Sequence, residues 1–159
     1  MTQIELNAKL NRLVGQKCVS FFVTPEKCLG VLLGEYDKSI DVSSHLWKIG
    51  TYYCGWRIVK ESRVLCGRDD VWENYQELRD HLNGLTLGNF VGIHQISELD
   101  IRVVFSCGTT IDFLGTTREK DDDIIHVFMP DHEMAKYTID HGWQFSRTDK
   151  SPTLDSLEV

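Results

Sequence analysis

The sequence predicts an α+β fold, mostly antiparallel β meanders with two helices, arranged as two similar helix-plus-meander halves. Helical spacing is confined to two short segments, and most other segments are rich in β-branched or aromatic residues between short polar turns. The order of these segments is also repeated. At 159 residues, 42% of them hydrophobic, the chain suits one globular domain. We expect a single domain over residues 1–150, with halves 1–68 and 69–150, and a flexible tail over 151–159.

The first half begins with a predicted helix over residues 4–15. Its apolar residues recur near helical spacing, and Gly15 is the expected C-terminal cap. The apolar positions are Ile4, Leu6, Leu10, Leu13 and Val14. Strands are expected at 19–24, 28–36, 39–43, 51–59 and 63–67, with the polar residues 60–62 as a hairpin loop.

The second half repeats this order. A helix is predicted over 69–84, with Asp69 or Asp70 as the N-cap and Glu73 in the first turn. One face of this helix would carry Trp72, Tyr75, Leu78 and Leu82. Strands are expected at 85–96, 99–105, 110–115, 124–129, 134–139 and 142–147, with a charged loop over 116–123.

Short motifs align the two halves in units of about 70 residues. The stretch 40–42 (Ile-Asp-Val) matches 111–113 (Ile-Asp-Phe), and the Gly-Trp pair at Trp56 matches the one at Trp143. We expect these tryptophans to be buried anchors of a common scaffold, because a tryptophan buries a large apolar area.

Charge is unevenly distributed along the chain, whose net charge is −7. Residues 1–68 contain ten Lys or Arg and six Asp or Glu, whereas residues 69–159 contain seven and eighteen. A carboxylate-rich surface repels nucleic-acid phosphates and attracts basic proteins. The later half is therefore expected to bind no nucleic acid, although such acids also serve solubility alone. No apolar run is long enough for a membrane span, and residues 1–15 lack the pattern of a secretion signal, so a cytoplasmic protein is expected.

No signature of a metal, cofactor or catalytic site is present. The five cysteines form no C-x-x-C pair, which favours reduced thiols. The cluster Asp131, His132 and Glu133 suits a solvated turn better than a metal site. A catalytic pair of Cys107 with His94 or His126 stays open, because such partners meet in space and not in sequence.

Several scaffold motifs resemble those of small bacterial immunity-type proteins associated with polymorphic or contact-dependent growth inhibition toxins. They are "GWRIVKESRVLCGRDD" at 55–70, "LNG" at 82–84, "LDIRVVFSCGTTIDFLG" at 99–115 and "HGWQFS" at 141–146. The chain departs from the family pattern at "HGW" and in the insertion "TTREKDDD". Most of this family has no known function, and for some members the resemblance implies immunity to a cognate toxin.

The sequence therefore leads to the hypothesis of a non-catalytic immunity protein that covers a basic toxin domain with an acidic surface. The expected partner-binding residues are Asp69, Asp70, Trp72, Glu73, Glu77, Glu119, Asp121, Asp122 and Asp123. Two alternatives stay open: a self-associating structural domain that uses an exposed sheet edge, and a small metal-dependent hydrolase. The oligomeric state is not predicted.

Overall fold

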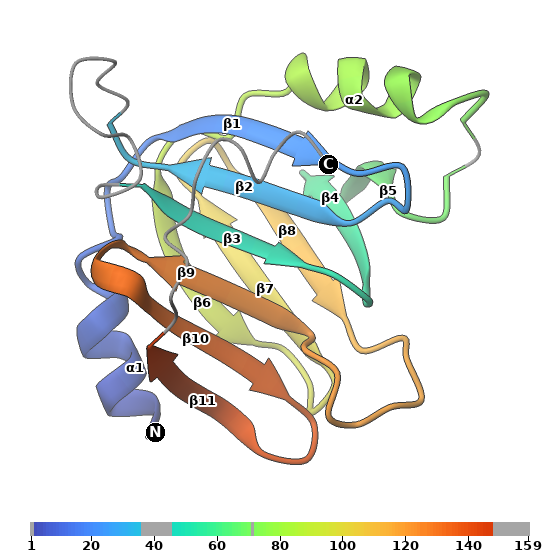
Figure 1. The fold of residues 1–159 in the computed structure, drawn as a ribbon. Coiled ribbons are helices and arrows are strands. Elements are labelled where there is room, and N and C mark those ends of the chain that lie inside the picture. The colour runs from blue at the N-terminus through green and yellow to red at the C-terminus, as the bar shows by residue number, and fades with distance from the viewer. Residues whose placement is uncertain (1, 36–45, 71, 148–159) are drawn as a thin grey trace.

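The computed structural model describes residues 2–35, 46–70 and 72–147. In this part of the chain, two antiparallel sheets lie face to face, with two helices beside them (Figure 1). The larger sheet has the strand order β1-β2-β3-β9-β10-β11, and the smaller has the order β5-β4-β8-β7-β6. The predicted α+β class, with mostly antiparallel meanders and two helices, is confirmed.

The bounds of these elements agree with most of the predicted segments. The first half contains α1 (Gln3–Leu10), β1 (Cys18–Val23), β2 (Leu29–Leu33), β3 (Trp47–Thr51), β4 (Gly55–Lys60) and β5 (Arg63–Gly67). The second contains α2 (Tyr75–Asn83), β6 (Phe90–Gln95), β7 (Asp100–Phe105), β8 (Thr109–Leu114), β9 (Ile125–Met129), a 3-10 turn (Pro130–His132), β10 (Glu133–Thr138) and β11 (Gly142–Arg147).

The two sheets share one construction. The larger joins the meander β1-β2-β3 to the hairpin β9-β10, and the smaller joins the meander β6-β7-β8 to the hairpin β4-β5. Each half of the chain thus gives its meander to one sheet and its hairpin to the other, so neither half forms a sheet alone. β11 adds a further strand to the larger sheet and has no counterpart among the described residues.

Backbone pairing between the halves is also symmetric where the helices lead into the sheets. Lys17, just before β1, forms a bridge with Asn89, just before β6. On either side of this bridge, Phe90 N–H donates to Gln16 O and Cys18 N–H donates to Gly88 O, both at 2.9 Å. The sequence repeat is therefore a structural repeat about an approximate two-fold axis through this bridge.

This correspondence corrects one predicted match. It equates β4 with β9, so Trp56 on β4 and Trp143 on β11 do not occupy equivalent positions. Each tryptophan follows a glycine at the start of a strand, which is enough to align two short motifs. The predicted strand at 39–43, the match of 40–42 with 111–113 and the tail 151–159 lie outside the described residues.

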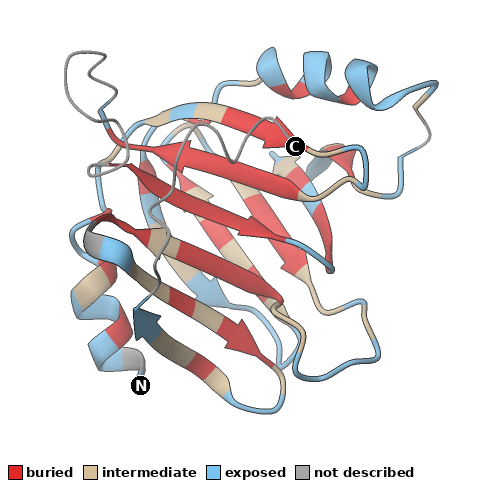
Figure 2. Ribbon diagram, in the orientation of Figure 1, coloured by how far each residue is buried: buried red, intermediate tan, exposed pale blue. Residues whose placement is uncertain are grey.

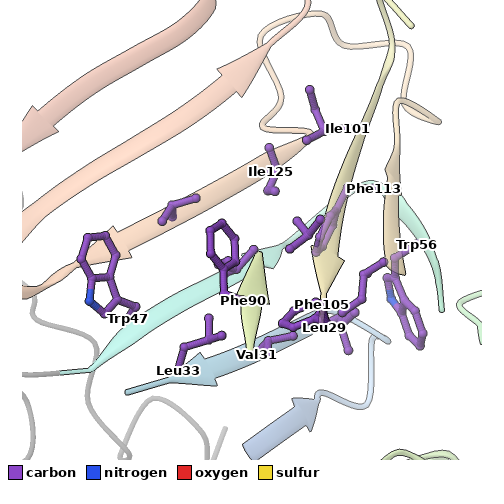
Figure 3. Close-up of a cluster of buried hydrophobic side chains, with 14 of the residues drawn as sticks. Leu29, Val31, Leu33, Trp47, Trp56, Phe90, Ile101, Phe105, Phe113 and Ile125 are labelled. Atoms are coloured by element: carbon purple, nitrogen blue, oxygen red, sulfur yellow. The ribbon is translucent and has the colours of Figure 1, made fainter. Parts of the chain in front are cut away.

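The space between the sheets holds the hydrophobic core. Side chains from both sheets point into it (Figure 3), and the two tryptophans are buried there with exposed fractions of 2% for Trp56 and 8% for Trp143. The indole N–H of Trp56 donates to Lys27 O at 2.8 Å, which satisfies its polar atom. Both tryptophans are core anchors, as predicted.

Each helix lies beside an edge of the sandwich (Figure 1). α1 lies near β10 and β11, where the Lys9 ammonium contacts the Glu133 carboxylate and the Phe145 ring. α2 packs against β1 and buries Leu78 and Leu82, while most of its other residues are exposed (Figure 2). α1 therefore lies against strands from the second half of the chain, and α2 packs against a strand from the first half.

Both helices are shorter than predicted. α1 ends at Leu10 with Asn11 as its C-cap, and Gly15 lies in a later turn with a φ of 87°. α2 begins at Tyr75 because the Asn74 side chain accepts from Glu77 N–H, so Asn74 is the N-cap in place of Asp69 or Asp70. Trp72 and Glu73 therefore precede the helix.

The predicted strand over 51–59 is two strands. β3 ends at Thr51, residues 52–54 form a turn, and β4 begins at Gly55. Most of β3 was not predicted, because Lys48 and Gly50 interrupt its apolar pattern. The predicted 60–62 hairpin is confirmed: Glu61 and Ser62 form its two-residue loop with positive φ angles, as a twisted hairpin requires.

Candidate functional site

Several predicted partner-binding acids lie at one end of the sandwich. This end, which we call the acidic end, is formed by the β1–β2 turn (24–28), the β3–β4 turn (52–54), the segment 68–74 and the β8–β9 loop (115–124). It lies toward the right of Figure 1, with the segment before α2 above and the β8–β9 loop below. The segment that precedes α2 contacts the β3–β4 turn through Arg68, and the β8–β9 loop contacts Gly55, which directly follows that turn.

Hydrogen bonds from cations to main-chain carbonyls hold the segment 68–74. The Arg68 guanidinium donates to Tyr53 O at 2.6 Å, to Cys54 O at 3.0 Å and to Glu26 O at 3.4 Å. The Lys27 ammonium donates to Asp70 O at 3.2 Å. These two cations bind carbonyl oxygens and form no ion pair with a described carboxylate.

The β8–β9 loop is held by main-chain contacts and one ion pair. Gly55 N–H donates to Thr116 Oγ1 at 2.8 Å, and Gly115 N–H donates to Leu99 O at 2.8 Å. The carboxylate of Asp123 lies 3.3 Å from the Lys136 ammonium. Burial raises the pKa of Asp123, an effect that Lys136 only partly offsets.

The predicted residues fall into an exposed group and a partly buried group. The exposed group consists of Asp69, Asp70, Glu73, Glu77, Glu119 and Asp121, and the partly buried group of Trp72, Asp122 and Asp123. Asp123 alone of these acids forms an ion pair with another described residue. Glu77 lies on α2 and accepts from Glu73 N–H, which ties it to the helix start.

Trp72 packs partly buried against the core, and its ring lies 5.4 Å from that of His81. Its indole nitrogen is buried and has no hydrogen-bond partner among the described residues. Most of the ring is therefore structural, and only part of it is available to a partner.

The other sequence candidates do not come together as a catalytic or metal site. Cys107 Sγ donates to Leu87 O at 2.7 Å in the β7–β8 turn, whereas His126 belongs to the other sheet and His94 pairs with Arg102 near the start of β7, away from this turn. Glu133 pairs with Lys9 at 3.6 Å. Within 2–35, 46–70 and 72–147, no three His, Cys, Asp or Glu side chains could jointly hold a metal ion.

The smaller sheet buries an acidic residue between two arginines. Asp112 is fully buried, and its carboxylate lies 2.8 Å from Arg57 Nε and 2.6 Å from Arg102 Nε. Burial alone would raise the pKa of Asp112, but the hydrogen bonds from Arg102 and Arg57 hold it below its ordinary value. Arg57, within the "GWRIVK" strand, therefore has a structural partner.

A second site lies on the outer face of the larger sheet, where the strand register places Phe22, Gly30, Gly50 and His126 in one row across β1, β2, β3 and β9. A Cβ on Gly30 would lie 1.9 Å from the Phe22 ring, and a Cβ on Gly50 would lie 3.1 Å from His126 Nε2. The two glycines therefore let both rings lie close against the sheet.

Lys48 lies beside this row and is only 6% exposed. Its ammonium is 4.9 Å from the Phe22 ring centre, 5.4 Å from that of Phe128 and 5.6 Å from that of Tyr52. No described carboxylate pairs with it. Burial lowers the pKa of Lys48 to about 8.

His126 is 1% exposed and stacks on Tyr52 with ring centres 4.4 Å apart. Neither ring nitrogen has a hydrogen-bond partner among the described residues. Burial, and then the charge of Lys48, lower the pKa of His126 to about 3, so its imidazole is neutral at pH 7.

A cavity of about 330 Å³ lies at this site, which we call the Lys48 cavity. It is lined by Phe22, Thr24, Glu26, Cys28, Leu29, Lys48, Thr51, Tyr52 and His126. The sequence alone did not predict this cavity. A lysine in "LWKIGT" and a histidine in "IIHVFM" are polar interruptions of apolar strands, and this signal could have indicated a shared sheet face.

Replacing Lys48 with methionine is expected to raise the free energy of unfolding by about 1 kcal/mol at pH 7. Methionine keeps apolar contact with the rings and removes a charge that burial disfavours. Urea denaturation measures the change, with Lys17→Met, at an exposed position, as the control. A loss of stability with Lys48→Met would show that contacts between the ammonium and the rings outweigh the cost of burying it.

Comparison with known proteins does not assign the chain to a family. No family model, curated protein or solved structure matches it. Among the described residues, neither helix is long and apolar enough to cross a membrane.

Proposed function

We propose that this protein is a cytoplasmic immunity protein that binds a basic toxin domain with its acidic end and blocks it without catalysis. One observation carries the proposal. Two segments far apart in sequence bring exposed carboxylates to the same end, while nearby Arg68 and Lys27 donate to main-chain carbonyls. The motif resemblance to immunity-type proteins supports the same function.

The blocking mechanism would be electrostatic and steric. A toxin that acts on nucleic acid or nucleotides presents Lys and Arg where phosphate binds, and carboxylates can occupy those positions. Complementary charge accelerates the encounter and restricts the choice of partner. Asp121 and Glu119 in the β8–β9 loop, with Asp69 and Asp70 on the other side of the β3–β4 turn, are the proposed contacts.

The test compares two double variants with equal changes in net charge. Asp121→Lys/Asp122→Lys alters the acidic end, whereas the control, Glu61→Lys/Asp80→Lys, alters the β4–β5 hairpin and the far part of α2. The first is expected to weaken binding at least about tenfold and the second less than about threefold. Asp123 is left unchanged because it is part of an ion pair with Lys136.

The binding partner for this test is a basic C-terminal toxin domain, to be sought in the reading frame next to the gene of this chain. Isothermal titration calorimetry gives the affinities, and thermal unfolding verifies that both variants stay folded. Equal affinity of the two double variants, or no binding by the wild type, would contradict the proposed interface.

A further inference from the structure

We propose that the Lys48 cavity binds a small planar carboxylate, with its carboxylate group between Lys48 and His126 and its apolar part against Phe22 and Tyr52. This site is on the outer face of the larger sheet and adjoins the acidic end, because Glu26, Cys28 and Tyr52 of the β1–β2 and β3–β4 turns line it. The inference does not depend on the proposed toxin partner.

Specific side chains define the shape of the Lys48 cavity. Phe22 and His126 occupy space that a side chain on Gly30 or Gly50 would fill, and Tyr52 stacks on His126. Its volume of about 330 Å³ is at the lower end of the range of small-molecule sites. A single ring with one substituent fits such a volume.

The charge of Lys48 points to an anionic ligand. Among the residues that the structure describes, no carboxylate pairs with this buried ammonium, and the surrounding rings compensate for only part of its lost hydration. With a pKa of about 8, Lys48 is still mainly protonated at pH 7. An anion placed beside it would supply a counter-charge that no described carboxylate supplies.

The unpaired nitrogens of His126 favour a carboxylate over a bulkier anion. A neutral imidazole has one N–H donor, and a carboxylate has two oxygens, so one oxygen can accept from His126 while the other faces Lys48. The cavity offers no arginine or other described cation for a second negative charge. Its aromatic and aliphatic lining suits a planar apolar body.

Benzoate is the probe for this site, with benzamide as its neutral analogue and benzylamine as its cationic one. Binding is measured by calorimetry and by ¹⁵N chemical shifts of the histidine side chains. Benzoate is expected to bind with a Kd below about 10 mM and to shift the His126 signals, and benzamide to bind at least about tenfold more weakly. Benzylamine is expected not to bind.

Two variants separate this site from nonspecific binding. Lys48→Met is expected to weaken benzoate binding at least about tenfold, and the control Lys17→Met to leave it unchanged. His126→Phe keeps a ring over Gly50 and is expected to weaken binding about tenfold by removing the N–H donor. Thermal unfolding verifies the fold of each variant.

The pH dependence has a defined sign. Benzoate should bind the protonated form of Lys48, so its affinity should be about tenfold lower at pH 9 than at pH 7. The titratable groups around Lys48 are Glu26, Cys28, Tyr52 and His126. Lys136 is next to His126 in register, but its ammonium pairs with Asp123.

Three results would overturn the proposal. They are no benzoate binding up to about 10 mM, equal affinity for benzoate and benzamide, and unchanged affinity in a folded Lys48→Met protein.

Discussion

Lowering the pH from 7 to 5 is expected to reduce the free energy of unfolding by about 2 kcal/mol more in the wild type than in His126→Phe. In the folded protein the pKa of His126 is about 3, whereas the ordinary value is 6.5. Above pH 6.5 the imidazole is neutral in both states and contributes no pH dependence. Between pH 6.5 and 3 the unfolded chain binds a proton that the folded protein excludes, so stability falls as the pH falls.

Phenylalanine is the suitable replacement, because it keeps a ring against Gly50 and Tyr52 and removes the titrating group. The described histidines other than His126 are present in both proteins, so their contributions cancel in the comparison. Urea denaturation at several pH values measures the difference. Parallel pH profiles for the two proteins would show that His126 is accessible to protons in the folded state.

Replacing Asp112 with asparagine is expected to lower the free energy of unfolding by about 3 kcal/mol at pH 7. The substitution keeps the shape of the side chain and removes the negative charge between two guanidinium groups. Breaking a buried ion pair usually costs about 3–5 kcal/mol. The lower end applies here because the side chains of Arg57 and Arg102 are 44% and 36% exposed and can turn to water.

The matched control is Arg57→Gln, which leaves Asp112 paired with Arg102 through two contacts, and it is expected to cost about 1 kcal/mol. The wild-type contribution of Asp112 has a defined pH range, because its folded pKa is below the ordinary value of 3.8. This contribution is complete well above pH 3.8 and is lost as the pH falls through the lowered pKa. A loss below about 1 kcal/mol for Asp112→Asn would contradict the structural role of this carboxylate.

The sequence was sufficient for the fold class and for most strands because their apolar patterns are local. The hairpin loop at Glu61 and Ser62 was predictable because it is short and polar, although both residues adopt positive φ angles that usually favour Gly, Asn or Asp. Helix starts were less predictable, since several residues before α2 can act as caps. The Asp70 carboxylate accepts from Gly67 N–H, whereas the Asn74 side chain accepts from Glu77 N–H and caps the helix.

The exchange of hairpins between the two sheets was not predictable from the repeat alone. Two similar halves can form separate sheets or share them, and the sequence motifs are the same in both arrangements. The Lys48 cavity was missed for a related reason: its residues come from four strands and from the turns beside them. Only the register of β2, β3 and β9 brings Gly30, Gly50 and His126 into one row.

The acidic residues were predictable as a group, but their individual roles were not. Glu119 and Asp121 are exposed as expected, whereas Asp123 is partly buried and pairs with Lys136. Counting charges along a chain cannot separate these cases, because pairing depends on which strand lies beside the loop.

Protection of growing cells is the most direct test of the proposed function. A bacterial strain is made to express a basic toxin domain that the wild type binds in calorimetry, together with the wild type, Asp121→Lys/Asp122→Lys or Glu61→Lys/Asp80→Lys, at equal protein levels. We predict growth with the wild type and the Glu61/Asp80 variant, and arrest with the Asp121/Asp122 variant. Full protection by a folded Asp121→Lys/Asp122→Lys protein would contradict the claim that the acidic end neutralises the toxin.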